Sequence, residues 1–129
     1  MKRLVILAVM GAVGMGVAPV SFAANCDRTV LRNDYDYIYC SSKIYEKADA
    51  ELNKNYKALR AKLGPNSRNA ATLKSGQLRW IRERDAECMT GSQMNVDCVL
   101  EQTKSRNSWL QDRLRECRTV GCMRSKLGD

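Results

Sequence analysis

The stretch that decides the fold is 96-VDCVLEQTKSRNSWLQDRLREC-117. Apolar and small polar side chains recur along one side of it at steps of three and four: Val96, Val99, Leu100, Thr103, Asn107, Leu110, Leu114 and Cys117. This spacing indicates an amphipathic helix of about six turns, and strand-like alternation is missing from it. Gly121 is expected to close the helix, because glycine is favoured just beyond a helix end.

A second helical stripe lies upstream, in residues 45–63. Its members are Tyr45, Asp49, Leu52, Tyr56, Leu59 and Leu63. Ser41 or Ser42 is expected to cap the start of this helix, and Gly64-Pro65 should end it.

Between these two stretches, residues 70–88 form a third stripe. It consists of Ala70, Leu73, Gln77, Trp80, Ile81, Arg84 and Cys88. We expect Ser67 to cap this helix and Thr90-Gly91 to break it. Short connections between helices favour antiparallel neighbours, so the sequence predicts an all-α, antiparallel up-down three-helix bundle.

The segment before the first helix reads differently. Residues 32–40, RNDYDYIYC, place two acids and three tyrosines in a short run between Cys26 and Cys40. We interpret Cys26 to Tyr39 as a short non-helical N-terminal arm, a turn or 3₁₀ segment held by its flanking cysteines.

The cysteine content predicts a disulfide framework. The six cysteines are Cys26, Cys40, Cys88, Cys98, Cys117 and Cys122. An even number in a short exported chain favours disulfides, and the chain has no histidine and no CxxC pair that would favour a metal. We predict sequential pairing: Cys26–Cys40, Cys88–Cys98 and Cys117–Cys122. Pairing of Cys40 with Cys88 and of Cys26 with Cys98 is the alternative.

The N-terminus has the features of a secretory signal peptide. Lys2 and Arg3 precede an apolar run over residues 4–20. In Ser21-Phe22-Ala23, small residues lie three and one positions before a cut between Ala23 and Ala24. The alternative is an uncleaved membrane anchor, which the glycines and the proline of the run disfavour. We therefore expect residues 1–23 to be removed, leaving residues 24–129 as a single helical domain in the periplasm or outside the cell.

The charge favours anionic partners. The whole chain has a formal net charge of +8, and removal of Lys2 and Arg3 leaves +6. Such a charge suits membrane surfaces or polyanionic envelope polymers, although it also serves solubility alone. Nucleic acid is a further anionic partner that the charge would suit, but the predicted export of the protein argues against it.

Polar side chains interrupt the apolar stripes and are expected to meet. Asp49 on the first helix and Arg84 on the second fall at similar height in an antiparallel pair, which suggests an ion pair. The complete predicted network consists of Asp49, Asn53, Gln77, Arg84 and Arg106. It could be a ligand site, but we favour a buried structural network that fixes the helix register.

An enzymatic function has little support. The chain has no histidine to act as a general base at neutral pH. It also lacks a phosphate-binding glycine loop, a metal-ligand spacing and a nucleophile elbow. We predict no catalytic residue, no metal and no cofactor.

Three motifs resemble the lysozyme-inhibitor LprI-like family over residues 40–114. They are Asp49-x-x-Leu52-Asn53-x-x-Tyr56, Gln77-x-x-Trp80-Ile81-x-x-Arg84-Asp85-x-x-Cys88 and Cys98-x4-Thr103-x-x-Arg106-x3-Leu110. The resemblance implies a small, exported, helical bacterial protein and, by analogy with the namesake of the family, inhibition of lysozyme. The chain departs from the family in lacking the lipid anchor of the namesake and in adding Cys117 and Cys122.

The charge of the partner limits how inhibition could work. Animal lysozymes are typically basic, so a protein of +6 should be repelled at long range unless its surface is locally complementary. Asp34, Tyr35, Asp36 and Tyr37 form an acidic, aromatic group that could supply this complementarity. Two alternatives remain: a protruding Lys or Arg enters the lysozyme cleft, or the tyrosines only pack over the end of the bundle. A basic module that binds anionic envelope polymers or lipids is the alternative function.

Overall fold

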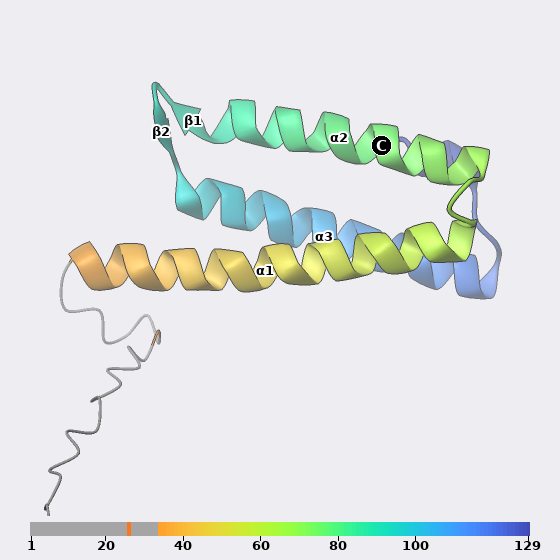
Figure 1. Cartoon of the computed structure of the whole chain (residues 1–129), viewed down its shortest axis with the longest axis horizontal. Coiled ribbons are helices and arrows are strands. Elements are labelled where there is room, and N and C mark those ends of the chain that lie inside the picture. The colour runs from red at the N-terminus through yellow and green to blue at the C-terminus, as the bar shows by residue number, and fades with distance from the viewer. Residues whose placement is uncertain (1–25, 27–33) are drawn as a thin grey trace, which may run out of the picture.

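The chain folds into three helices joined by short connections. The computed structural model describes residue 26 and residues 34–129, so the predicted signal peptide lies outside the described residues. The elements are α1 (Asp34–Leu63), α2 (Arg68–Cys88), β1 (Met89–Thr90), β2 (Gln93–Met94), α3 (Val96–Thr119) and the 3₁₀ helix η2 (Arg124–Lys126). Figure 1 shows α1 and α3 side by side, with α2 running back above them and the β1–β2 hairpin at one end. The predicted all-α antiparallel three-helix bundle is confirmed.

The helix boundaries follow local signals with one exception. Ser67 caps α2 by accepting from the backbone N–H of Ala70 at 3.0 Å, as predicted, and Asn95 caps α3 in the same way. The predicted start of α1 at Ser41 or Ser42 is wrong, because α1 begins at Asp34, so residues 34–39 of the predicted non-helical arm are helical. Ser41 is buried within the helix, and the Tyr37 hydroxyl in the added turns donates a hydrogen bond to Asp97 at the start of α3.

The core is a row of leucines contributed by all three helices and by the tail. Its buried members are Leu52, Leu59, Leu73, Leu110, Leu114 and Leu127. Five of them belong to the predicted stripes, so the helical periodicity identified the inward faces correctly. Leu127 follows η2 and carries no periodic signal. Among the described residues, no helix is both long and apolar enough to cross a membrane.

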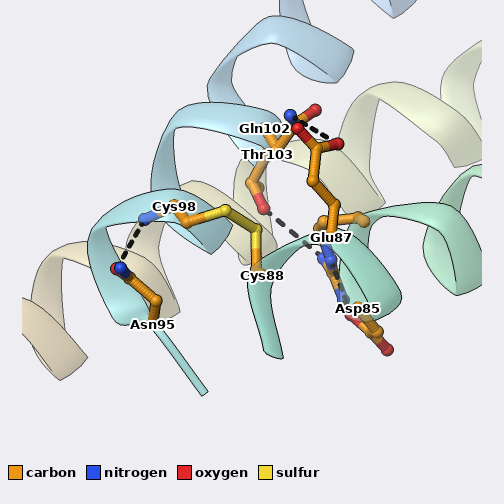
Figure 2. The surroundings of a disulfide bond; sticks show 8 residues. Asp85, Glu87, Cys88, Asn95, Cys98, Gln102 and Thr103 are labelled. Atoms are coloured by element: carbon orange, nitrogen blue, oxygen red, sulfur yellow. Dashed lines mark hydrogen bonds and ion pairs between the residues drawn. A yellow bond between two sulfur atoms is a disulfide. The ribbon is translucent and has the colours of Figure 1, made fainter. Parts of the chain in front are cut away.

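Three disulfides join cysteines that follow one another along the chain. They are Cys26–Cys40, Cys88–Cys98 and Cys117–Cys122, which is the predicted pairing. Figure 2 shows how Cys88–Cys98 links the end of α2 to the first turn of α3 across the β1–β2 hairpin. Beside it, the Gln102 amide donates to Glu87 at 3.2 Å, so the same junction also has a polar link.

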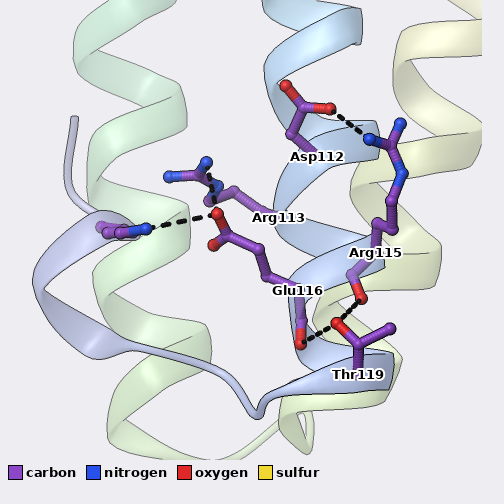
Figure 3. A network of polar contacts seen from close by, with 6 residues as sticks. Asp112, Arg113, Arg115, Glu116 and Thr119 are labelled. Carbon is purple, nitrogen blue, oxygen red and sulfur yellow. Dashed lines mark hydrogen bonds and ion pairs between the residues drawn. The ribbon is translucent and has the colours of Figure 1, made fainter.

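The tail, residues 120–129, returns from the end of α3 along α2. Glu116 accepts from Arg113 at 2.9 Å and from Lys126 of η2 at 3.3 Å, which links the tail to α3 (Figure 3). On the other side, the Arg79 guanidinium donates to the main-chain oxygen of Gly128. The tail is therefore a packed part of the bundle, held between α2 and α3.

Gly76 allows this close approach, which leads to a first prediction. A Cβ at position 76 would lie 3.2 Å from the main-chain oxygen of Leu127 and 3.3 Å from Gly128. We expect Gly76→Ala to be nearly neutral, because better helix propensity offsets a small displacement of the tail. Gly76→Val should lower the free energy of unfolding by about 1–3 kcal/mol through overpacking. Urea unfolding measures both, and equal stability of the two variants would show that the tail is not packed here.

Candidate functional site

Arginine and tryptophan side chains alternate along the junction of α2 and α3. The guanidinium carbon of Arg106 lies 3.9 Å from the ring centroid of Trp109 and 5.7 Å from that of Trp80. Arg84 extends the stack on the Trp80 side at 5.0 Å, and Arg113 on the Trp109 side at 5.6 Å. Each guanidinium thus lies over an aromatic ring, which attracts a cation strongly when both are shielded from water.

Arg84 has different hydrogen-bond partners from those expected. Its Nε and Nη2 donate to Asp85 at 2.9 and 2.7 Å, and its Nη1 lies 3.4 Å from the Thr103 hydroxyl. Asp49 instead accepts from the Asn53 amide at 3.1 Å. The expected Asp49–Arg84 ion pair is therefore wrong. Asp85 is the next residue on α2, so its carboxylate pairs with Arg84 without any side chain crossing to another helix.

Arg106 is the most deeply buried of these charges, being 5% exposed. Its Nε donates to Gln77 at 3.0 Å, and its Nη1 donates to the main-chain oxygen of Asp129 in the tail. Burial, with a smaller effect of nearby Arg79, lowers the pKa of Arg106 to about 10, although Asp129 and Glu83 oppose the shift. The guanidinium thus remains charged at neutral pH and joins α2, α3 and the tail.

A cleft of about 220 Å³ opens between α1 and α2 beside this stack. Asp49 and Asn53 lie on its α1 wall, and Gln77 and Arg84 on its α2 wall. Four of the five predicted network residues therefore share one cleft, and Arg106 contacts it through Gln77. The cleft offers hydrogen-bond donors and acceptors beside apolar side chains, which suits the binding of a ligand.

The N-terminal end of α1 forms a second candidate surface, next to the hairpin. Tyr37, Ile38 and Tyr39 are 44%, 63% and 41% exposed. Beside them, a mainly apolar pocket of about 180 Å³ is lined by Tyr45, Met94 and five other residues from α1, α2 and α3. Of the predicted binding residues, only the Tyr37 side chain is described; those of Asp34, Tyr35 and Asp36 lie outside the described part of the structure.

Charge is segregated along the bundle. We call the end formed by residues 34–46 and 80–101 the hairpin end; it carries eight Asp or Glu and three Lys or Arg. We call the opposite end, formed by residues 57–79 and 107–129, the basic end; it carries eleven Lys or Arg and three Asp or Glu. The antiparallel order of the helices brings these segments together (Figure 1). The net charge of the whole chain did not predict this segregation. The charges of the separate segments do predict it once the order of the helices is known.

Comparison with known proteins gives one family. The family described as lysozyme inhibitor LprI matches residues 26–110. No curated protein and no solved structure gives a match. The matched range contains the Arg–Trp stack up to Trp109, the α1–α2 cleft and the hairpin end, but not the tail.

Proposed function

Since the chain belongs to the lysozyme inhibitor LprI family, we propose that it binds and inhibits a lysozyme-type muramidase. The same membership and the three disulfides favour a location outside the cytoplasm. In this proposal the signal peptide is cleaved after Ala23 and the mature protein acts in the periplasm or outside the cell. It acts by occupying a surface of its partner and not by catalysis.

We assign the binding surface to the hairpin end, and the charge segregation is the observation that carries this assignment. The 30 residues of α1 are about 45 Å long, several times the screening length of about 8–10 Å at physiological salt. A partner approaching one end therefore responds mainly to the charge of that end. An acidic hairpin end attracts a basic lysozyme even though the whole chain is positive.

The apolar side chains of the hairpin end would supply the contact area. Tyr37, Ile38, Tyr39 and Met94 are all more than two-fifths exposed, and the nearby pocket can receive a side chain of the partner. Tyrosines give large contact area with few rotatable bonds, which is why they are frequent at binding hot spots. The hydrogen bond to Asp97 holds the Tyr37 hydroxyl in place before binding, which reduces the ordering cost.

Neutralising the acids tests this assignment. Asp34→Asn with Asp36→Asn should slow association with lysozyme by about threefold to tenfold at low salt, and the difference should shrink as salt rises. The matched control is Glu51→Gln with Asp112→Asn, which removes the same charge away from the hairpin end. The association rates of the two double variants are compared by surface plasmon resonance. Inhibition of cell-wall lysis by lysozyme is measured in parallel.

Two results would count against the proposal. If both double variants lose inhibition equally, the hairpin end is not the binding surface, and a basic side chain entering the lysozyme cleft becomes the better explanation. If the wild-type protein leaves lysozyme fully active at about tens of micromolar, well above the Kd of a standard specific interface, inhibition itself is rejected.

The basic end supports a second candidate function, the binding of anionic envelope polymers or lipids. Eleven cationic side chains against three acids give this end a strong positive field. Binding of this kind should collapse as salt rises, whereas a tyrosine-anchored contact with lysozyme should persist. Both functions can coexist, because they use opposite ends of the bundle.

A further inference from the structure

A concave site of about 350 Å³ lies between α2 and the tail, at the basic end. On α2 it is lined by Arg68, Thr72, Ser75 and Arg79, which follow steps of four, three and four and so share one helix face. Arg124 of η2 and Gly128 close it from the tail. Three guanidinium groups from two separate elements therefore border one hollow.

The three arginines differ in how they are held. Arg79 is fixed by its hydrogen bond to the Gly128 main-chain oxygen, and its Nε lies 3.8 Å from Glu83. Within the described part of the chain, Arg68 and Arg124 have no carboxylate in ion-pair range. Glu83 is thus the one carboxylate in ion-pair range of these three arginines in the described part of the chain, and the guanidinium groups outnumber it.

We propose that this hollow binds a phosphate group, either free or carried by a lipid headgroup. The planar guanidinium fork matches phosphate oxygens in a bidentate manner, and charge-assisted hydrogen bonds of this kind are strong. Ser75 adds a hydroxyl donor, and Gly76 lets the Gly128 backbone lie close to α2, which brings the two walls of the hollow together. The Thr72 hydroxyl donates to the Arg68 carbonyl at 3.0 Å within the first turn of α2.

The site depends on the tail, which lies beyond the part of the chain that matches the family. Arg124 and Gly128 reach α2 because Leu127 is buried in the core and Lys126 pairs with Glu116. The proposal deepens the second candidate function and does not rest on lysozyme binding, which we assign to the other end. Failure of one therefore leaves the other standing.

A titration of the folded protein with inorganic phosphate tests the site. Ionic strength is held constant with sodium chloride, and amide shifts are followed by NMR. We expect saturable shifts centred on Ser75, Gly76 and Gly128. Arg68→Gln and Arg124→Gln should each weaken phosphate binding by about tenfold, as loss of a charge-assisted hydrogen bond implies. The control variants Arg82→Gln and Arg118→Gln remove the same charge from exposed positions outside the hollow and should change affinity less than about twofold.

Flotation with phosphatidylcholine vesicles, with and without phosphatidic acid, separates the two phosphate sources. Phosphatidic acid-dependent binding that is lost in Arg68→Gln with Arg124→Gln, and kept in Arg82→Gln with Arg118→Gln, assigns the phosphate to a lipid headgroup. Saturable phosphate binding without vesicle binding assigns it to a soluble compound. Shifts that do not saturate, or equal weakening by the control variants, would overturn the proposal.

Discussion

Replacing Arg106 with alanine is expected to lower the free energy of unfolding by about 3 kcal/mol. The change leaves the Gln77 oxygen buried without its donor, which costs about 1–3 kcal/mol. It also removes the cation from between Trp80 and Trp109 and opens a cavity where the guanidinium lay. Urea unfolding followed by tryptophan fluorescence measures the loss, because both tryptophans contact the substituted side chain.

Four further variants show which interaction is responsible. Arg106→Lys keeps a charge but not the planar stack, so it should recover less than half of the loss. Arg106→Met with Gln77→Leu should be more stable than Arg106→Met alone, because the double change does not leave the Gln77 amide buried without its donor. Additive effects of the two single changes would mean that Arg106 and Gln77 are not coupled.

The same residue gives a pH dependence of known sign. Burial lowers the pKa of Arg106 to about 10, so the unfolded chain binds this proton more tightly than the folded protein does. The contribution of Arg106 to stability is therefore constant below about pH 9 and becomes more favourable as pH rises through its folded pKa. The stability difference between the wild-type protein and Arg106→Met should follow that trend, and a difference that shrinks above pH 10 would contradict it.

The second large effect is expected in the tail. Leu127→Ala should lower the free energy of unfolding by about 2–5 kcal/mol, because Leu127 is 1% exposed and packs within the leucine core. Val120→Ala is the matched control; Val120 is 73% exposed in the same tail, and its truncation should change stability by less than about 0.5 kcal/mol.

The size of the Leu127 effect decides the role of the tail. A loss close to that of the control would mean that the family-matched region folds without the tail. A loss in the expected range would instead make residues 120–129 part of the core. Measurement of both variants by urea and by thermal unfolding separates these outcomes.

Helical periodicity predicted most of the fold because the buried face of each helix is a local property. Leu59, Leu73 and Leu110 all lie at predicted stripe positions and are fully buried. The start of α1 was not predictable in this way. Ser41 resembles a cap in the sequence, yet Tyr37 bonds to Asp97, 60 residues away, and the helix continues back to Asp34. The extra turns of α1 thus come with a contact to α3, and a local sequence pattern cannot predict such a long-range contact.

The candidate site was predictable in its membership but not in its pairing. The sequence predicted that Asp49 and Arg84 lie at similar positions along the bundle axis, and both residues do line one cleft. Height along a bundle does not select a hydrogen-bond partner, however, and Asp85 is closer to Arg84 than any side chain of α1. The interleaving of Trp80, Arg106 and Trp109 likewise depends on the register between α2 and α3, which periodicity within one helix does not determine.

The order in which the disulfides join has a consequence for how the protein matures. Each cysteine pairs with its next neighbour along the chain: Cys26 with Cys40, Cys88 with Cys98, and Cys117 with Cys122. A chain threaded through a membrane N-terminus first would present both members of one pair before the next pair emerges. An oxidase that links thiols as they arrive therefore produces the native set directly. We therefore expect an exported chain to reach its native disulfides without an enzyme that reshuffles wrong ones, which refolding with and without an isomerase would measure.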